Sequence, residues 1–267
     1  MTPAPPPWLP LLATCLNATR DQVSANGMHV TTTYAVVPER RHDLITALAD
    51  LVQFLVTGSA EAADPASWRS GGRVARATWA RHLSTDARGV NAVMKGTLGE
   101  AIAWWHEGQQ PEVVYCQRPH LGVSQPFIDS LSILGCDPDQ VLRGVQAKMT
   151  AGLPRGRVHE AFGTFEQLQR GERDDFLAET IRRLRAELDQ ATGLTIDLEA
   201  ASTGTAMRHF HTFVCFGRQP PTDPAHDYHP RLNAHAHHGR SIALLMDNDI
   251  DGLARDVADL IRTRVLS

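Results

Sequence analysis

The densest group of side chains able to do chemistry lies near the carboxyl end, in "RHFHTFVCFG" (208–217) and "HPRLNAHAHHG" (229–239). Seven of the thirteen histidines fall between His209 and His238. Neutral imidazole is a good ligand for iron, zinc and copper near pH 7. The pattern therefore indicates a histidine-ligated metal or haem site. The alternative is a set of polar side chains on a half-exposed strand and a solvated loop.

The first stretch is typical of a β-strand, on which side chains alternate between two faces. His209, His211 and Phe213 would then share one face. Two imidazoles at positions i and i+2 lie about 7 Å apart and can converge on one ion. The second stretch would fold back over this strand if the strands on either side of it pair. The candidate metal ligands are His209, His211, His229, His235 and His237.

The kind of metal follows from what accompanies the histidines. The chain has no HExxH motif, and too few strands are predicted for a cupin-like barrel. A haem needs one axial imidazole, an apolar pocket and cations for its propionates. The residues that could contact a non-covalent haem b are Arg218, Arg231, Arg240 and Phe213, with His211 and Arg208 as candidate catalytic residues. The alternative is a non-haem Fe, Zn or Cu site on His209, His211 and either His235 or His237.

The arginine-rich composition and this block of histidine, arginine and aromatic residues resemble the small histidine-ligated haem proteins of antibiotic biosynthesis, among them the haem-dependent arginine N-hydroxylases. The resemblance rests on residues 205–245. It implies oxygen activation at haem iron and hydroxylation of a small polar substrate, such as the guanidine of arginine. The substrate's guanidinium would need carboxylates, for which Asp197 and Glu199, or Asp223 and Asp227, are candidates.

Composition bears on the binding partners and the cellular compartment of the protein. The net charge of −4 provides no overall attraction for nucleic acid or an anionic membrane. No apolar run approaches the length of about 20 residues that a membrane span needs. The four cysteines contain no CxxC pair, which suits a reducing cytoplasm. We therefore expect a cytoplasmic enzyme with a small-molecule substrate, O2 or H2O2 and an external electron donor. A homodimer and a non-catalytic ligand-binding protein remain alternatives.

The elements that must position the histidines can be read from periodicity and turn signals. Strands are predicted at 27–38, 111–116, 194–200, 207–217 and 241–247. Helices are predicted at 39–58, 73–83, 86–108, 173–193 and 249–266, after a proline-rich lead-in with a short helix within 1–20. Residues 117–138, with three prolines, are predicted to be irregular.

Helices dominate the N-terminal and middle parts and strands the C-terminal third, so the fold class is predicted as α+β with an antiparallel or mixed sheet. We expect one domain over 1–267, with a mostly helical subregion at 1–190 and a strand-rich one at 191–267. Two strand-then-helix units, 29–57 and 241–265, bracket the chain. They could bring both ends of the chain into one sheet.

Overall fold

The computed structural model describes residues 8–22, 29–57, 83–84, 92–119, 128–135, 140–172, 174–191, 207–217 and 239–266. Within these residues, seven strands form one sheet in the order β1-β2-β7-β6-β5-β4-β3. The strands are β1 (Leu16–Gln22), β2 (His29–Val36), β3 (Val113–Cys116), β4 (Ser130–Gly135), β5 (Gln140–Thr150), β6 (Met207–Phe216) and β7 (Gly239–Met246). The helices are α1 (Trp8–Thr14), the 3-10 turn η1 (Pro38–Arg40), α2 (Arg41–Thr57), α5 (Ala92–Gly108), α6 (Arg155–Gln169), α7 (Asp174–Ala191) and α10 (Ile250–Leu266).

The sheet is mixed. Its four central strands, β2, β7, β6 and β5, run parallel to one another. On one side β1 joins β2 antiparallel, and on the other side β4 and β3 continue from β5 as an antiparallel run. Parallel neighbours require crossover connections, and helices provide them here: α6 and α7 lie between β5 and β6 in the chain.

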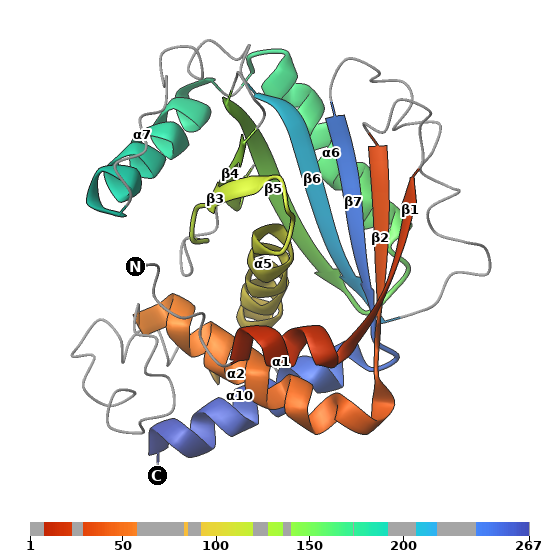
Figure 1. Ribbon diagram of the computed structural model, residues 1–267. Helices are drawn as coiled ribbons and strands as arrows, with labels where there is room; N and C mark the ends of the chain where they lie inside the picture. The colour runs from red at the N-terminus through yellow and green to blue at the C-terminus, as the bar shows by residue number, and fades with distance from the viewer. Residues whose placement is uncertain are drawn as a thin grey trace.

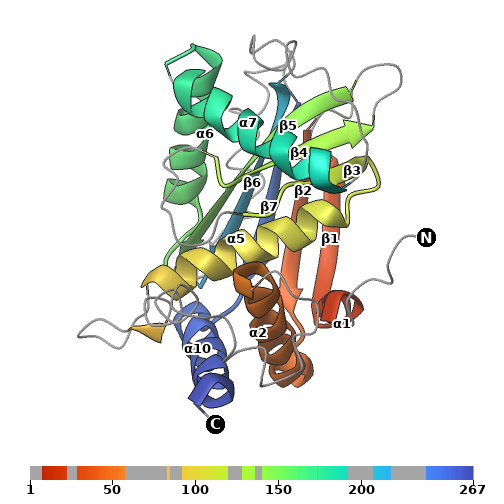
Figure 2. The same ribbon diagram turned by 90° about the vertical axis from the view of Figure 1, so that its left-hand side faces the viewer.

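Helices cover both faces of this sheet. Figure 1 shows α5 in front of the strands and α6 behind them, with α1, α2 and α10 gathered below α5. The view in Figure 2 separates the same layers, with α6 and α7 at different depths of the molecule. The α5 helix packs on β5 and also contacts α2 and α10, so it is the central helix of the structure.

The core forms where α2, α5 and α10 meet. On α2, Leu44, Leu48 and Leu51 fall on one side of the helix and are almost completely buried. The hydroxyl of Tyr34 on β2 lies 2.7 Å from Nδ1 of His106 on α5, in a buried hydrogen bond. This bond joins α5 to the parallel part of the sheet.

The structure confirms the α+β class and most of the predicted elements. In particular, β2 pairs with β7 in parallel register, His29 opposite Arg240, so the two ends of the chain do share one sheet. The strands predicted at 207–217 and 241–247 are adjacent, as β6 and β7. The helix predicted at 173–193 is present as α7. The strand predicted at 194–200 and the helix predicted at 73–83 lie outside the described residues, apart from Leu83.

Two segments differ from expectation. The lead-in contains the expected short helix, but β1 follows it directly, paired with β2 along its whole length. Residues 117–138 are not wholly irregular, because they contain β4, whose residues 130–134 are all buried. Prolines at 119, 126 and 138 suggested a continuous loop, but they flank this strand and do not interrupt it. The sheet therefore extends well outside the C-terminal third.

Two further expectations concern membrane-spanning helices and the cysteines. Within the described residues, no helix is both long enough and apolar enough to cross a membrane. Three of the cysteines, Cys15, Cys116 and Cys215, are free thiols.

Candidate functional site

The histidine candidates lie mostly beyond what the structure describes. Residues 218, 229, 231, 235 and 237 are outside the described ranges, as are 197, 199, 223 and 227. The backbone of residues 208, 209, 211 and 213 lies on β6, and that of residue 240 on β7. Their side chains are outside the description. The structure thus brings the backbones of 209 and 239 side by side, and the haem and metal hypotheses for these histidines stay predictions.

A different group of polar residues is well described, at the edge of β5. The β4 strand begins at Ser130, opposite Val145 of β5. The β5 strand runs on to Thr150, so residues 146–150 extend past the start of β4 along that edge. Among the described residues no strand pairs with this part of the edge, which leaves room for side chains from neighbouring elements to meet.

Asp129 is held at this edge by the backbone of β5. Its own N–H donates to the carbonyl of Val145, at 2.9 Å. Its Oδ2 accepts a hydrogen bond from the N–H of Ala147, at 2.6 Å. These two bonds bracket Gln146, so Asp129 lies directly across the ladder from Gln146. The position of the carboxylate is therefore fixed by main-chain geometry.

Gln146 and Lys148 lie at i and i+2 on β5 and so share one face of the sheet. The opposite face carries Ala147 and Met149, which contact α5 at Gly99. Lys148 Nζ lies 3.1 Å from Oε1 of Glu160 on α6, which places the lysine on the α6 side. This edge thus brings a carboxylate, an amide and an ammonium within a few residues of one another, with the amide of Gln146 almost completely buried.

Glu100 belongs to α5, which packs on the face of the sheet opposite Gln146 and Lys148, and it is linked to Asp129 and Lys148 electrostatically. It follows Gly99, the residue at which α5 packs closely on β5. Burial, helped by the nearby Asp129 carboxylate and opposed by the Lys148 ammonium, raises the pKa of Glu100 to about 8. Burial also raises the pKa of Asp129, to about 6, against the opposing effects of the Ala147 N–H and Lys148. Two acids that disfavour each other's charge have therefore been placed together.

The group also contains unpaired polar atoms. Gln146 is 2% exposed, and its Oε1 has no hydrogen-bond partner among the described residues. Thr212 of β6 is the register partner of Gln146, and its buried Oγ1 is likewise unpaired within those residues. Adjacent positions on parallel strands point to the same face. Buried oxygens of this kind are ordinarily satisfied by a ligand, an ordered water or another part of the chain.

The donor set consists only of oxygen: two carboxylates and one amide carbonyl. Hard divalent cations such as Mg2+ and Mn2+ prefer oxygen ligands, whereas zinc and copper favour nitrogen and sulfur. A bound cation would favour the ionised forms of Glu100 and Asp129, whose pKa values are raised, and would satisfy the unpaired amide oxygen of Gln146. No three His, Cys, Asp or Glu side chains in the described part of the chain are grouped to hold a metal by themselves. The amide and solvent or substrate oxygens would complete the shell.

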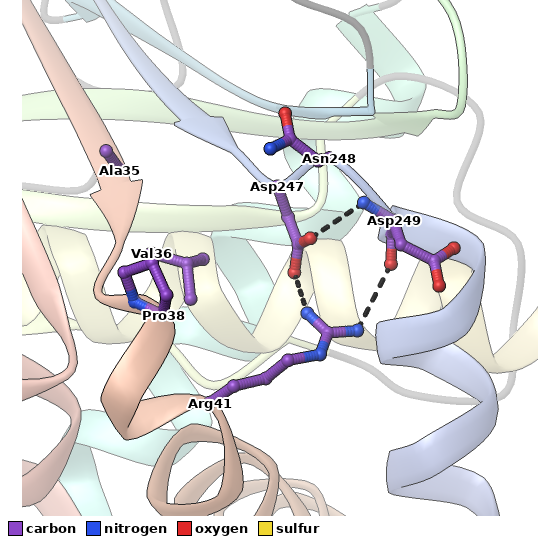
Figure 3. A pocket seen from close by; sticks show the side chains of 7 residues that line it. All are labelled: Ala35, Val36, Pro38, Arg41, Asp247, Asn248 and Asp249. Carbon is purple, nitrogen blue, oxygen red and sulfur yellow. Dashed lines mark hydrogen bonds and ion pairs between the residues drawn. The ribbon is translucent and has the colours of Figure 1, made fainter.

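A separate hollow of about 280 Å³ lies at the carboxyl ends of β2 and β7, shown in Figure 3. Its charged groups are already paired. Arg41 donates to Asp247 Oδ2 at 2.5 Å, and Asp247 Oδ1 accepts from the N–H of Asp249 at 2.8 Å. This arrangement anchors the start of α10 next to α2. Its polar groups are therefore better paired than those at the edge of β5.

Sequence reasoning missed Glu100, Asp129, Gln146 and Lys148. A usable signal existed in "VQAKM", where a glutamine and a lysine at i and i+2 interrupt an otherwise apolar strand. Polar residues at alternate positions of a strand ordinarily mark its solvent-facing side, and it is the burial of Gln146 that makes this pair informative. Asp129, directly before the apolar run of β4, was the second part of that signal.

Comparison with known proteins gives no family to which the chain can be assigned: neither the protein-family models nor the curated proteins include a match.

Proposed function

We propose that the chain is a divalent-metal-dependent phosphodiesterase that cleaves nucleic acid at the edge of β5 that extends past the start of β4. The observation that carries this proposal is the placement of Asp129 across the ladder from Gln146, with Lys148 two residues further along the same face. Mg2+ sites commonly use one or two carboxylates together with substrate phosphates. Two carboxylates with a lysine beside them suit the displacement of a negatively charged leaving group.

Each residue has a role in this proposal. Glu100 and Asp129 hold the cation through their carboxylates, and Gln146 Oε1 accepts from a water or contributes a further oxygen. Lys148, whose ammonium acts on both acids, would place positive charge beside the phosphate. The cation, when bound, polarises the phosphate and lowers the pKa of a coordinated water. Hydrolysis would join the water oxygen to phosphorus, break one P–O ester bond and yield a phosphate monoester and a hydroxyl group.

A polymeric phosphodiester is favoured over a small one by the surroundings. The site lies along a strand edge, which a linear polymer can approach. The α6 helix begins close after β5 and exposes Arg155 and Arg157 in its first turn. Arg157 pairs with Glu160, which pairs with Lys148, so exposed cations lie next to the proposed site. The net charge of −4 gives no long-range attraction, and binding would depend on such local contacts.

The test is cleavage of linear and circular DNA and of RNA in Mg2+ or Mn2+, with EDTA as the reference. Asp129→Asn, Glu100→Gln and Lys148→Met should each reduce cleavage by at least about 100-fold, as expected for groups that stabilise transition-state charge. Matched controls are Asp259→Asn on α10 and Glu179→Gln on α7, which alter exposed carboxylates.

Controls that keep full activity beside inactive site variants would support the proposal. Cleavage that persists in EDTA, or equal activity in Asp129→Asn and wild type, would refute it. A protein that cleaves no nucleic acid and binds no Mn2+ by calorimetry would also refute it.

A further inference from the structure

A buried ion pair fastens α5 to β5 at some distance from the proposed site. Arg143 Nη1 donates to Glu107 Oε1 at 2.9 Å, and Arg143 Nη2 donates to Glu112 Oε1 at 2.9 Å. The Arg143 side chain is 9% exposed and that of Glu107 is fully buried. One guanidinium therefore joins the middle of the sheet to the end of α5 and to the turn that leads into β3.

The pair and the proposed site lie on the same two elements. Glu107 follows Glu100 by two helical turns, so the two carboxylates lie on one side of α5. Arg143 precedes Gln146 and Lys148 on β5. The helix thus touches β5 at two places: at Gly99, beside Glu100, against Ala147 and Met149, and at Glu107 against Arg143. Fixing the second contact limits how α5 can slide or rotate at the first.

We propose that Arg143 and Glu107 are positioning residues of the metal site: their ion pair sets the register of α5 on β5 and thereby holds the Glu100 carboxylate beside Asp129. This inference rests on the function proposed above for Glu100 and Asp129. Neither Arg143 nor Glu107 need touch the substrate or the cation.

The chemistry of the pair argues for positioning over simple stability. Removing two charges from water opposes burial, and buried ion pairs often contribute no more to stability than well-packed apolar residues of the same size. Besides Arg143, the Ser132 hydroxyl also favours the charged form of the Glu107 carboxyl. Burial is also the largest influence on the Glu107 carboxyl and raises its pKa, against Arg143. A directional contact between two defined atoms, however, permits one register only.

The test replaces both partners at once, because removing one would leave a buried charge. The double variant Arg143→Met/Glu107→Leu should unfold in urea at the same midpoint as the wild type or a higher one. Its Mn2+ affinity, measured by calorimetry, should fall by about 10- to 100-fold, as for other groups that orient a ligand. The Mn2+ affinity of Arg143→Lys, which keeps the charge but loses the forked geometry, should lie between those of the wild type and the double variant. The matched control is Arg264→Met/Asp50→Leu, which removes an ion pair of 2.6 Å between α10 and α2.

Crystal structures of the wild type and the double variant provide a readout that needs no metal. The proposal predicts that α5 shifts and that the Glu100 carboxylate moves away from Asp129. A double variant with Glu100 in its wild-type place and Mn2+ affinity within twofold of wild type would overturn it. If the wild type itself binds no Mn2+, the proposed function fails, and the position of Glu100 in the two structures alone supports or overturns the positioning role. If the double variant does not fold, Arg143→Lys answers the same question.

Discussion

Asp129 lies across the β4–β5 ladder from Gln146, with its N–H bonded to Val145 and its Oδ2 bonded to the N–H of Ala147. The main chain thus fixes the acid on both sides of a glutamine whose amide oxygen has no described partner. A carboxylate held in this way cannot turn aside to avoid Glu100. The two acids share a site whose net interaction is unfavourable until a cation or a proton is added.

The first prediction concerns Glu100→Gln in the metal-free protein. The pKa of Glu100 is raised to about 8 from 4.5, so between these values the folded chain holds a proton that the unfolded chain has lost. The wild type therefore loses stability as pH rises through this window. Glu100→Gln removes the ionisation, and its stability advantage should grow by roughly 1 kcal/mol per pH unit from pH 5 to pH 8. Urea unfolding at several pH values measures it.

The control for that series is Glu179→Gln, a substitution on the exposed face of α7. Its unfolding should follow the wild type at every pH. A constant difference between Glu100→Gln and wild type would mean that the pKa of Glu100 is not raised in the folded protein.

The second prediction concerns stabilisation by metal. A cation that binds only the folded state should add about 2.7 kcal/mol to the free energy of unfolding at one hundred times its dissociation constant. Because both acids must lose their protons to bind it, the effect of Mn2+ should increase from pH 6 to pH 8. Thermal unfolding with and without Mn2+ tests this, and Asp129→Asn should show little response. An equal response in Asp129→Asn would place the cation elsewhere.

The third prediction concerns Gln146. An unpaired buried amide oxygen costs about 1–3 kcal/mol, so Gln146→Leu should leave the metal-free fold equally stable or more stable. The same change should weaken Mn2+ binding, because one oxygen is lost. Gln146→Glu is the informative counterpart: a third carboxylate should destabilise the metal-free protein and retain or strengthen Mn2+ binding. Identical Mn2+ affinity in all three proteins would remove Gln146 from the site.

The fourth prediction separates the metal hypothesis from the haem hypothesis. If a histidine of the C-terminal third binds haem b, the purified protein has a Soret band that one alanine replacement among His209, His211, His229, His235 and His237 abolishes. The site at β5 predicts a colourless protein with metal-dependent cleavage. A coloured preparation without nuclease activity would favour the first hypothesis.

Helices and strands with a clear pattern within a short stretch of sequence were predicted correctly. The stripe of Leu44, Leu48 and Leu51 predicted a helix, and the β-branched run around Thr31 predicted a strand. The pairing of β2 with β7 was predicted only from the similarity of two strand-then-helix units. The β4 strand was missed because nearby prolines dominated the interpretation, although they lie outside the strand.

The candidate site was beyond such reasoning for a physical reason. Glu100 lies on a helix, Asp129 before one strand and Lys148 on the next, and no short motif joins them. Only the antiparallel register of β4 on β5, together with the packing of Gly99 on Met149, brings them together. The histidine cluster, by contrast, attracted attention because its members are close in sequence.

The parallel pairing of β2 with β7 has a consequence for folding during translation. Arg41 and Asp247, which join α2 to the start of α10, are 206 residues apart in the chain. On the ribosome β2 is synthesised long before its neighbour β7, and closing such a long loop is slow. Nascent β2 would meanwhile expose a bare strand edge, so chaperone dependence and sensitivity to premature termination should be pronounced for this molecule.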